Sequence, residues 1–360
     1  MTAAELLVAY LAPQGPPSAL PAGDWAAVAT LAHKHRLAPL LYHHLTPHHA
    51  DLPREVYDTL RQAHGVCAAN NMVYHYEQQR ITAAFGAGPP LLLHKGLTVA
   101  EQLYGDIALR PTMDIDLLVR RRDLDAARER LEPLGWQLKP TVFDTKNLHL
   151  AKQVAGLDLL VELHWTTAEA GEFQLPEETL WAHTVAEGSI HRFTAEMTLL
   201  HLLLHAAHHG FRPYRLMVDV AQALANGQKT LDWPTFLALA AEADALPLCA
   251  AVIALAHDQL DVPVPRHERL QRLAARPAVR AIRRWLTAER LLMRPSYADM
   301  DRYLVPLAVG HLSSARFFLR DFLLTPSQMR AIYQLPPDSR RVWLYYLARP
   351  FWLLRDYLQR

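Results

Sequence analysis

The sequence predicts an α+β protein in which a small core with a mixed sheet lies between helical regions. Two observations predict this class. Between Leu91 and Trp165, short apolar runs of strand length alternate with helical stretches, which describes a compact α/β unit. On both sides of this unit, apolar residues recur at helical spacing. We therefore expect a helical N-terminal region at 1–85, the core at 86–170, a helical region at 171–265 and an Arg-rich helical C-terminal region at 266–360.

The composition is that of a globular chain. Of its 360 residues, 51% are hydrophobic and 20% are charged, which excludes disorder of the whole chain. Cys67 and Cys249 are the only cysteines, so a disulfide framework is excluded too. Every apolar stretch of about 18 residues contains a charge, a histidine or a proline, and residues 1–30 lack the pattern of a secretory signal. We therefore expect no transmembrane segment and a cytoplasmic location.

The net charge of +1 conceals an uneven distribution. Residues 266–360 contain eighteen Arg and seven Asp or Glu, a balance of +11, so residues 1–265 carry −10. One interpretation is a solvated helical surface, since Arg outnumbers Lys throughout the chain by thirty-one to six. The other is an electropositive face that attracts a nucleotide or a nucleic acid.

The helical regions are predicted from apolar spacing and from the positions of prolines. In 1–85, apolar residues at i, i+3 and i+4 indicate several short helices that prolines separate, followed by one longer helix over 55–84. After residue 166 only helices are predicted. Two span 195–209 and 215–225, and a third begins at Asp232, an N-cap residue two positions before a proline.

Strands and helices alternate within the core. Five elements over about 75 residues suit one small sheet that helices cover. The strands are predicted at 91–93, 113–119 and 157–165, and the helices at 97–104 and 121–135, the second of which ends at a glycine.

Two acids interrupt the apolar strand predicted at 113–119. Successive side chains of a strand point to opposite faces, so Asp114 and Asp116 share one face while Ile115 and Leu117 are buried on the other. Carboxylates this close repel each other unless a cation lies between them. Oxygen ligands favour Mg²⁺ or Mn²⁺ over zinc, so the pair predicts a site for one of these ions.

A third acid for this cluster comes from the strand predicted at 157–165. Asp158, Glu162 and His164 share one face of this strand. Either acid could serve. Glu162 is the stronger candidate, because Asp158 lies near the start of the strand whereas Glu162 occupies a position that a central strand would otherwise make apolar.

A turn with a lysine and a glycine precedes the acid strand. Lys95 and Gly96 follow a predicted strand and begin a helix. Glycine lets the backbone approach an anion, and the first turn of a helix offers free N–H groups with a positive dipole end. With the charge of Lys95 and the hydroxyl of Thr98, this turn could bind a triphosphate, although by itself it is no more than a plain helix start.

These motifs resemble those of the polymerase-beta-like nucleotidyltransferase superfamily, whose core is a glycine turn, an Asp-x-Asp strand and a later third carboxylate. More narrowly, the chain resembles an uncharacterised bacterial nucleotidyltransferase family with a Lys-Gly turn, an Arg-x-x-x-Asp-x-Asp-Leu-Leu-Val strand and an acid-x-His-Trp strand. One difference is Leu97, where the superfamily usually has serine or glycine after the first glycine. The matching positions are Lys95, Gly96, Arg110, Asp114, Asp116, Glu162, His164 and Trp165.

The resemblance implies a polymerase-beta-like sheet and a reaction. The reaction transfers an NMP group from an NTP, with ATP the expected donor, to a peptide, protein or small-molecule acceptor and releases pyrophosphate. It implies two Mg²⁺ (or Mn²⁺) ions held by Asp114 and Asp116, with Glu162 binding the ion that activates the acceptor hydroxyl and taking its proton. Arg110 would neutralise phosphate charge or form a salt bridge that orients an aspartate. The expected nucleotide-binding residues are Lys95, Gly96, Thr98 and Arg110.

Other residues keep several interpretations. His164 could contact the acceptor or the carboxylates, or be a hydrogen-bonded histidine at a strand end. The histidines of the helix at 195–209, among them His205, could be structural, could line the acceptor or nucleotide pocket, or could bind zinc. Asp219 belongs to the matching region and could lie near the acceptor, and it is expected to form an ion pair with Arg215 at i, i+4.

Two functions of other classes are also compatible with the sequence. A nucleic-acid-binding protein would use the Arg-rich region 266–360 and lose affinity steeply as salt is added. A catalytically silent interaction protein would keep the fold without transferring a nucleotide. The acceptor, the base of the NTP and the oligomeric state are not encoded in these motifs.

Overall fold

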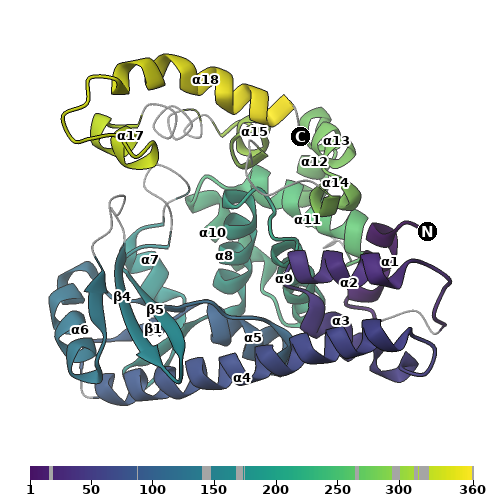
Figure 1. Cartoon of the computed structure of the whole chain (residues 1–360), viewed down its shortest axis with the longest axis horizontal. Helices are drawn as coiled ribbons and strands as arrows, with labels where there is room; N and C mark the ends of the chain where they lie inside the picture. Colours follow the sequence, from purple (N-terminus) through teal and green to yellow (C-terminus); the bar gives the residue numbers. More distant parts are fainter. Residues whose placement is uncertain are drawn as a thin grey trace.

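A computed structural model describes residues 1–15, 19–86, 88–139, 147–167, 173, 175–263, 267–293, 301–311, 315 and 324–358. Within these residues a mixed seven-stranded sheet lies at one end of the molecule, and helices make up most of the rest (Figure 1). The strands are β1 (Leu91–Leu93), β2 (Ile115–Leu118), β3 (Gln137–Lys139), β4 (Asn147–Val154), β5 (Leu157–His164), β6 (Thr184–Glu187) and β7 (Ile190–Phe193).

The α-helices that matter most for the site are α4, α5, α8 and α9. The full set is α1 (Ala3–Leu11), α2 (Trp25–Lys34), α3 (Ala38–Leu45), α4 (Arg54–Phe85), α5 (Gly96–Tyr104), α6 (Leu124–Leu131), α7 (Glu177–Ala182), α8 (Ala195–His208), α9 (Arg215–Asn226), α10 (Trp233–Glu242), α11 (Leu246–Leu260), α12 (Glu268–Ala274), α13 (Pro277–Trp285), α14 (Ala288–Met293), α15 (Asp301–Ala308), α17 (Pro326–Ile332) and α18 (Val342–Leu358).

The sheet has the strand order β3-β4-β5-β2-β1-β7-β6. At its centre, β2 runs parallel to β5 and antiparallel to β1, and β1 runs parallel to β7. The remaining neighbours pair in antiparallel fashion. The predicted α+β class with a mixed sheet is therefore confirmed, and β2, which carries Asp116, has a hydrogen-bonded neighbour on each side.

Alternation along the central strands decides which face of the sheet is covered. Ile115 and Leu117 of β2, with Val161 and Leu163 of β5, are buried in one apolar cluster with side chains of α4 and α6. Side chains at the intervening positions point to the opposite face. On that face, Leu92 of β1 and Leu118 of β2 are buried in a second apolar cluster together with side chains of α8 and α9.

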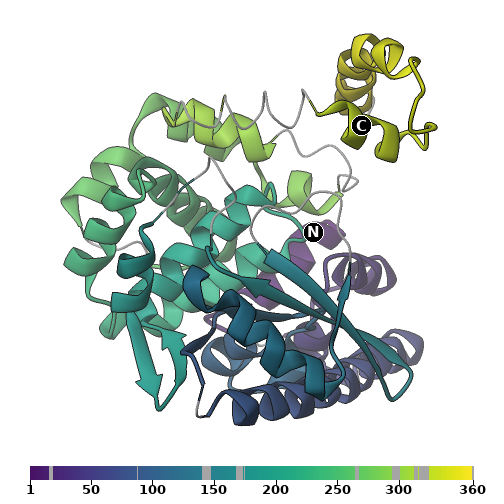
Figure 2. The ribbon, with the colours of Figure 1, turned by 90° about the vertical axis from the view of Figure 1, so that its left-hand side faces the viewer.

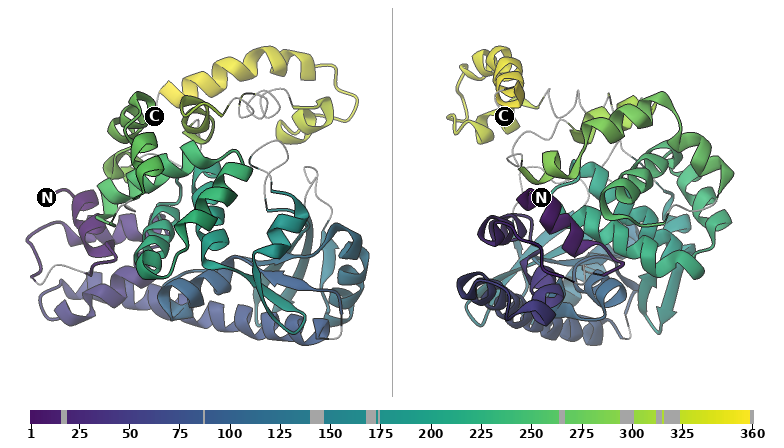
Figure 3. Two further views of the ribbon diagram at one scale, coloured as in Figure 1. Left: turned by 180° about the vertical axis from the view of Figure 1, so that it is seen from behind. Right: turned by 90° about the vertical axis from the view of Figure 1, so that its right-hand side faces the viewer.

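Helix α4 joins the sheet to the N-terminal helices. Its 32 residues run the length of the molecule, beneath the sheet at one end and beneath α2 and α3 at the other (Figures 1 and 3). Val56 and Leu60, near its start, are buried with the N-terminal helices, whereas Ile81 and Phe85, near its end, are buried under the sheet. One helix therefore fixes the N-terminal region relative to the strands that carry the site.

The predicted elements of the core are present with small changes at their ends. The long helix expected at 55–84 is α4, and the strands expected at 91–93, 113–119 and 157–165 are β1, β2 and β5. The helix expected at 121–135 is α6 with a 3₁₀ turn at each end.

Four strands were not predicted. β3 and β4 fall between predicted elements of the core, and β6 and β7 lie beyond residue 166, so the prediction of helices alone in that part was wrong. β3 and β6 are short edge strands with mostly exposed side chains, so they lack the apolar alternation of a half-buried strand. The β4–β5 hairpin left a clearer signal, because Ala155 and Gly156 form its two-residue connection with φ of 51° and 79°.

Helices α17 and α18 lie beside the main body of the molecule, as Figure 2 shows. They come from the Arg-rich part of the chain, and the residues just before and within α17 reach the cavity described below. Among the described residues, no helix has the length and apolar character that a membrane span requires.

Candidate active site

The pairing of β2 with β5 places two acids side by side. In this parallel ladder Asp116 is opposite Glu162, and Leu118 is opposite His164. Residues two apart on a strand share a face, so Glu162 and His164 point to the same side as Asp116. Asp114 lies one residue before β2 and lines the same cavity. The three acids expected from the sequence therefore open into one space.

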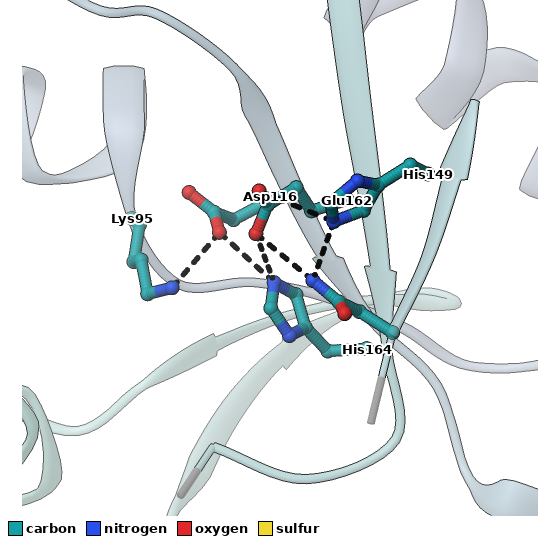
Figure 4. A network of polar contacts seen from close by, with 6 residues as sticks. Lys95, Asp116, His149, Glu162 and His164 are labelled. Atoms are coloured by element: carbon teal, nitrogen blue, oxygen red, sulfur yellow. Dashed lines mark hydrogen bonds and ion pairs between the residues drawn. The ribbon is translucent and has the colours of Figure 1, made fainter. Parts of the chain in front are cut away.

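Polar contacts join these side chains into a network (Figure 4). Lys95 Nζ donates to Asp116 Oδ1 at 2.9 Å, and His164 Nε2 lies 3.1 Å from the same oxygen. His164 Nε2 also lies 3.2 Å from Glu162 Oε2, so the imidazole lies between the two carboxylates. Nitrogen groups of the chain itself therefore offset the repulsion between these acids.

The surroundings drive the pKa values of the two aspartates apart. Burial would raise the pKa of Asp116, but the charge of Lys95 and the hydrogen bond from His164 outweigh it and hold that pKa well below its usual range. Asp114 makes no hydrogen bond or ion pair within the described residues. Burial, with the charges of Asp116 and Glu162, raises the pKa of Asp114 to about 7. The ionised form of Asp114 therefore lacks the direct contact with a nitrogen group that Asp116 and Glu162 have.

Strand β4 contributes two side chains that the sequence analysis missed. Asn147 Nδ2 donates to Glu162 Oε2 at 3.1 Å, and His149 Nε2 lies 3.6 Å from Glu162 Oε1. The β4–β5 register explains this, since His149 is opposite Glu162 and Asn147 is opposite His164. Both residues would have been found if the hairpin before β5 had been recognised from its connection.

The structure also separates the two candidates for the third acid. Asp158 lies near the start of β5 and is exposed, where Gln153 Nε2 donates to its Oδ1 at 2.9 Å. Glu162 lies two residues before the end of the strand and lines the cavity. The cluster therefore uses Glu162.

Gly96 begins α5 in a conformation that favours glycine. Its φ is +52°, and a Cβ here would lie 3.2 Å from the backbone oxygen of Asp114. Its own carbonyl accepts a hydrogen bond from Arg110 Nη1 at 3.0 Å. The residue type is thus set by the left-handed backbone and by the close approach of the segment before β2.

Arg110 is held by Asp219 rather than facing the cavity as a free charge. Its Nε lies 3.0 Å and 3.1 Å from the two Asp219 oxygens, its Nη2 donates to Oδ2 at 3.0 Å, and Tyr104 donates to Oδ1 at 2.8 Å. Arg110 and Asp219 are 6% and 0% exposed. Of the two interpretations of Arg110, the salt bridge is the one observed. The expected Arg215–Asp219 pair was wrong: among the described residues, Arg215 Nη1 donates to the Pro111 carbonyl at 3.0 Å.

The acids open into a cavity of about 750 Å³ between the sheet and the helices. Arg36, from the corner between α2 and α3, lines it on one side, and Leu324 and Gln328 reach it from the C-terminal part. All four predicted regions therefore border this cavity. The histidines of α8 and the residue after it also line it: His201, His205, His208 and His209.

Histidine rings of α8 and of the residue after it contact one another along the wall, with His201 stacked on His205 and His209 edge to face with His205. The ring centroids of His201 and His205 are 5.9 Å apart, and those of His205 and His209 are 4.5 Å apart. Burial lowers the pKa of His205 well below its usual value and that of His201 to about 3, so both are neutral. These histidines line the cavity, and their role as structural groups, as contacts of the acceptor or nucleotide, or as zinc ligands stays a prediction.

Two residues expected at the site lie outside the cavity wall. Thr98 is 3% exposed in the first turn of α5, and Asp219 is enclosed by Arg110 and Tyr104. Neither side chain is among those that border the cavity. Asp219 binds Arg110, which in turn donates to the Gly96 carbonyl.

The arrangement can be compared with known proteins. A family model described as an uncharacterised nucleotidyltransferase matches residues 21–261. The chain belongs to this family. No curated protein and no solved structure matches it. The matched residues run from before α2 to the end of α11, so they include every strand and most of the cavity wall. As a member of this family, the chain is an enzyme of the nucleotidyltransferase class.

Nucleotidyl transfer uses divalent metal ions, and this nucleotidyltransferase has side chains that fit one. Ligand atoms of His94, Asp116 and His164 all lie within 4.8 Å of one another, and the three residues are buried. Both ring nitrogens of His94 are buried and have no hydrogen-bond partner in the described part of the chain. Burial also holds the pKa of His94 well below its usual value, so the imidazole is in the neutral form that binds metal.

His94 was not among the ligands predicted from the sequence. It directly follows β1 and precedes Lys95, so the strand end that carries the glycine turn also carries this imidazole. Two nitrogens and one carboxylate suit Mn²⁺ or another transition metal, whereas the oxygen set of Asp114, Asp116 and Glu162 suits Mg²⁺. Asp116 belongs to both sets.

Replacing Gly96 with alanine is expected to reduce activity of this nucleotidyltransferase about 10-fold and to destabilise it by about 1–2 kcal/mol. The cost comes from the positive φ and from the contact that the new Cβ makes with the Asp114 carbonyl. Initial rates and urea unfolding measure the two effects.

The matched control is Gly105→Ala at the other end of α5. Gly105 has a φ of +69°, but a Cβ there meets nothing within 4 Å. This variant should lose about 1 kcal/mol of stability and keep the rate of the wild type. Equal rates for the two variants would show that the position of the Asp114 backbone has no influence on catalysis.

Proposed function

We propose that the protein transfers an NMP group from an NTP, with ATP the expected donor, to a hydroxyl of a peptide, protein or small molecule and releases pyrophosphate. We also propose that its core is of the polymerase-beta-like type. The observation that carries the proposal is the Asp116–Glu162 pair, in register on parallel central strands beside Asp114 and the Gly96 turn. The family match supports the same reaction class.

The acids are proposed to bind the cation that the reaction needs. A divalent ion held by Asp116, with Asp114 and Glu162 or with His94 and His164, would neutralise charge on the phosphoryl group being transferred. The raised pKa of Asp114 supports this role, since an incoming cation would favour its ionised form.

Glu162 is proposed to orient the acceptor. Burial would raise the pKa of Glu162, but the hydrogen bond from His164 outweighs it and lowers this pKa. Glu162 therefore remains ionised and accepts a hydrogen bond from the attacking hydroxyl. The acceptor oxygen forms a bond to the α-phosphorus, the bond from that phosphorus to the bridging oxygen breaks, and pyrophosphate leaves with the electron pair. The hydroxyl proton is released to water. Asn147 and His149 hold the carboxylate of Glu162 in place.

Lys95 and Gly96 are proposed to set the geometry at the donor. Lys95 binds Asp116 directly, and its pKa is raised because the attraction of Asp116 outweighs burial, so it remains a cation. Arg110 holds the Gly96 carbonyl and thereby the first turn of α5. The turn and Arg110 thus serve as positioning groups for the nucleotide, supported by Asp219 beneath them.

The experiment that tests the proposal uses each NTP labelled at the α-phosphate, with Mg²⁺ or Mn²⁺. The acceptors offered are the protein itself, peptides with free hydroxyls and hydroxyl-bearing metabolites. Transfer of the label together with pyrophosphate release supports the proposal, and we expect ATP to be the best donor. Release of inorganic phosphate with the α-label left on free NDP would contradict it. Tight binding of DNA or RNA that weakens steeply with salt, without transfer, would favour the nucleic-acid-binding alternative instead.

A further inference from the structure

Most of the charged side chains at the cavity are already neutralised by the protein. Lys95 forms an ion pair with Asp116 at 2.9 Å, and Arg110 forms one with Asp219 at 3.0 Å. The side chains that the sequence singled out as cations for a triphosphate are therefore engaged with carboxylates of the chain. The cations left to meet a ligand must be sought elsewhere on the wall.

Arg215, the first residue of α9, is one of these cations. It lines the cavity, and its Nη1 donates to the Pro111 carbonyl at 3.0 Å, but it forms no ion pair among the described residues. Its Nε is buried without a hydrogen-bond partner. Burial and the neighbouring charge of Arg110 lower the pKa of Arg215 to about 10, although the charge of Asp219 opposes them.

Arg36 is the second cation. It lies at the corner between α2 and α3 with a φ of +59°, and its exposed side chain lines the same cavity. Within the described residues the Arg36 guanidinium has neither a hydrogen bond nor an ion pair. It is close enough that its charge contributes to the lowered pKa of Arg215. Two guanidinium groups from distant parts of the sequence thus face one space, and neither forms an ion pair within the described residues.

The location of Arg215 relates this pair to the acid cluster. Its charge acts on Asp114, and the segment that it binds, at Pro111, leads directly to that acid. The adjacent N-terminus of α5 has no side-chain cap from Lys95, so its first N–H groups add positive potential to this side of the cavity. A ligand that extends from Asp114 toward Arg36 therefore leaves the acids first and then lies next to cationic groups.

We propose that Arg215 and Arg36 form a subsite for a condensed phosphate, which in the reaction is the β,γ-pyrophosphate portion of the NTP. This inference rests on the proposed function for its role in catalysis, but the subsite itself is a binding property. The arginine fork matches phosphate oxygens in a bidentate manner, and an extended polyanion can contact both guanidinium groups at once. The subsite would hold the leaving group while the α-phosphate lies at the acids.

The alternative ligand of the same charge is an acidic group of the acceptor. A single carboxylate would compensate one of the two arginines, whereas pyrophosphate carries enough charge for both. The end of the subsite next to Asp114 is also the end at which the proposed transfer takes place, so the leaving group is the part of the reactants that belongs there. An acidic acceptor peptide is therefore kept as an outcome of the test.

The test measures binding of sodium tripolyphosphate, pyrophosphate, AMP and a Glu-rich peptide by calorimetry, with the full chain and Mg²⁺ present. Arg215→Gln should weaken tripolyphosphate binding at least about 10-fold, since it removes hydrogen bonds to a charged group. Arg36→Gln should weaken it about 3-fold, because this side chain is exposed and screened. AMP, which lacks the β,γ-phosphates, should bind the variants and the wild type equally.

The control is Arg280→Gln, which removes an exposed arginine from α13 outside the cavity wall and should leave all four affinities unchanged. Arg36→Gln removes no side-chain hydrogen bond or ion pair of the described chain, so it tests the subsite even if Arg215→Gln fails to fold. Unchanged tripolyphosphate affinity in Arg36→Gln and in folded Arg215→Gln would overturn the subsite. Loss of affinity for the Glu-rich peptide alone would assign the arginines to an acceptor.

The failure of this inference can be told apart from failure of the proposed function. If label transfer occurs but the arginine variants bind tripolyphosphate as the wild type does, the subsite is wrong and the reaction stands. If no NTP supports transfer, but tripolyphosphate binds to the wild type and not to Arg215→Gln, the subsite stands and the proposed reaction is wrong.

Discussion

Replacing Asp116 with asparagine should reduce the rate of nucleotidyl transfer at least ~10³-fold, because Asp116 belongs to both candidate metal-binding sets. Asparagine has the same shape but no charge, so Lys95 and His164 would lose the carboxylate that they both contact. The expected result is a protein that is folded, as judged by circular dichroism, and nearly inactive. Pyrophosphate release and transfer of an α-phosphate label measure the rate.

Asp158→Asn provides the matched control on β5. It makes the same chemical change on the cavity-side face of the strand, but at the exposed end where Asp158 contacts only Gln153 among the described residues. Its rate should lie within about twofold of the wild type. If Asp116→Asn retained a tenth or more of the activity, the acid cluster would not be the centre of the reaction.

The substitution Asp219→Ala should destabilise the protein by about 3–5 kcal/mol, because it leaves Arg110 buried without a counterion. Arg110→Ala should cost a similar amount by leaving Asp219 unpaired, and it also frees the Gly96 carbonyl. The free energy of unfolding in urea measures both.

A more exposed pair serves as the comparison for this effect. Arg283 and Asp258 have the same two-point contact, but their side chains are 33% and 32% exposed. Arg283→Ala should therefore cost less than about 1 kcal/mol. Similar losses for Asp219→Ala and Arg283→Ala would contradict the view that burial makes the Arg110 pair important.

A double variant separates stability from function. Arg110→Met with Asp219→Val replaces the buried pair by apolar side chains of comparable total size, and it should recover most of the stability lost by either single change. It cannot restore the hydrogen bond to the Gly96 carbonyl. We therefore expect transfer activity to remain at least about 10-fold below the wild type. Full recovery of activity would show that Arg110 contributes to stability alone and does not position the Gly96 turn for catalysis.

The acid pair and its strands could be predicted because they are local features. Ile115 and Leu117 alternate with Asp114 and Asp116, and in a strand that alternation fixes which residues are buried and which face the site. By the same rule, Glu162 lies on the face of its strand away from the buried Val161 and Leu163. The Lys-Gly turn before a helix is likewise encoded within a few residues, and the family to which the chain belongs follows from these short motifs.

Weak local patterns account for the strands that were missed. Edge strands such as β3 and β6 have few buried side chains, so their sequence lacks alternation. Missing β4 concealed Asn147 and His149, whose contacts with Glu162 depend on cross-strand register. Register between strands is a property of pairing and cannot be obtained from one strand alone.

By itself the sequence determined the α+β class, the faces of the central strands, the acids and the glycine turn, since each depends on side chains a few positions apart. Only the tertiary structure decided that Arg110 binds Asp219, 109 residues away. It also decided that His94 lies beside Asp116, and that Arg36 and Arg215 share a cavity. The physical reason is that charge compensation and desolvation depend on which distant groups the packed helices and strands bring together, and no spacing along the chain specifies that.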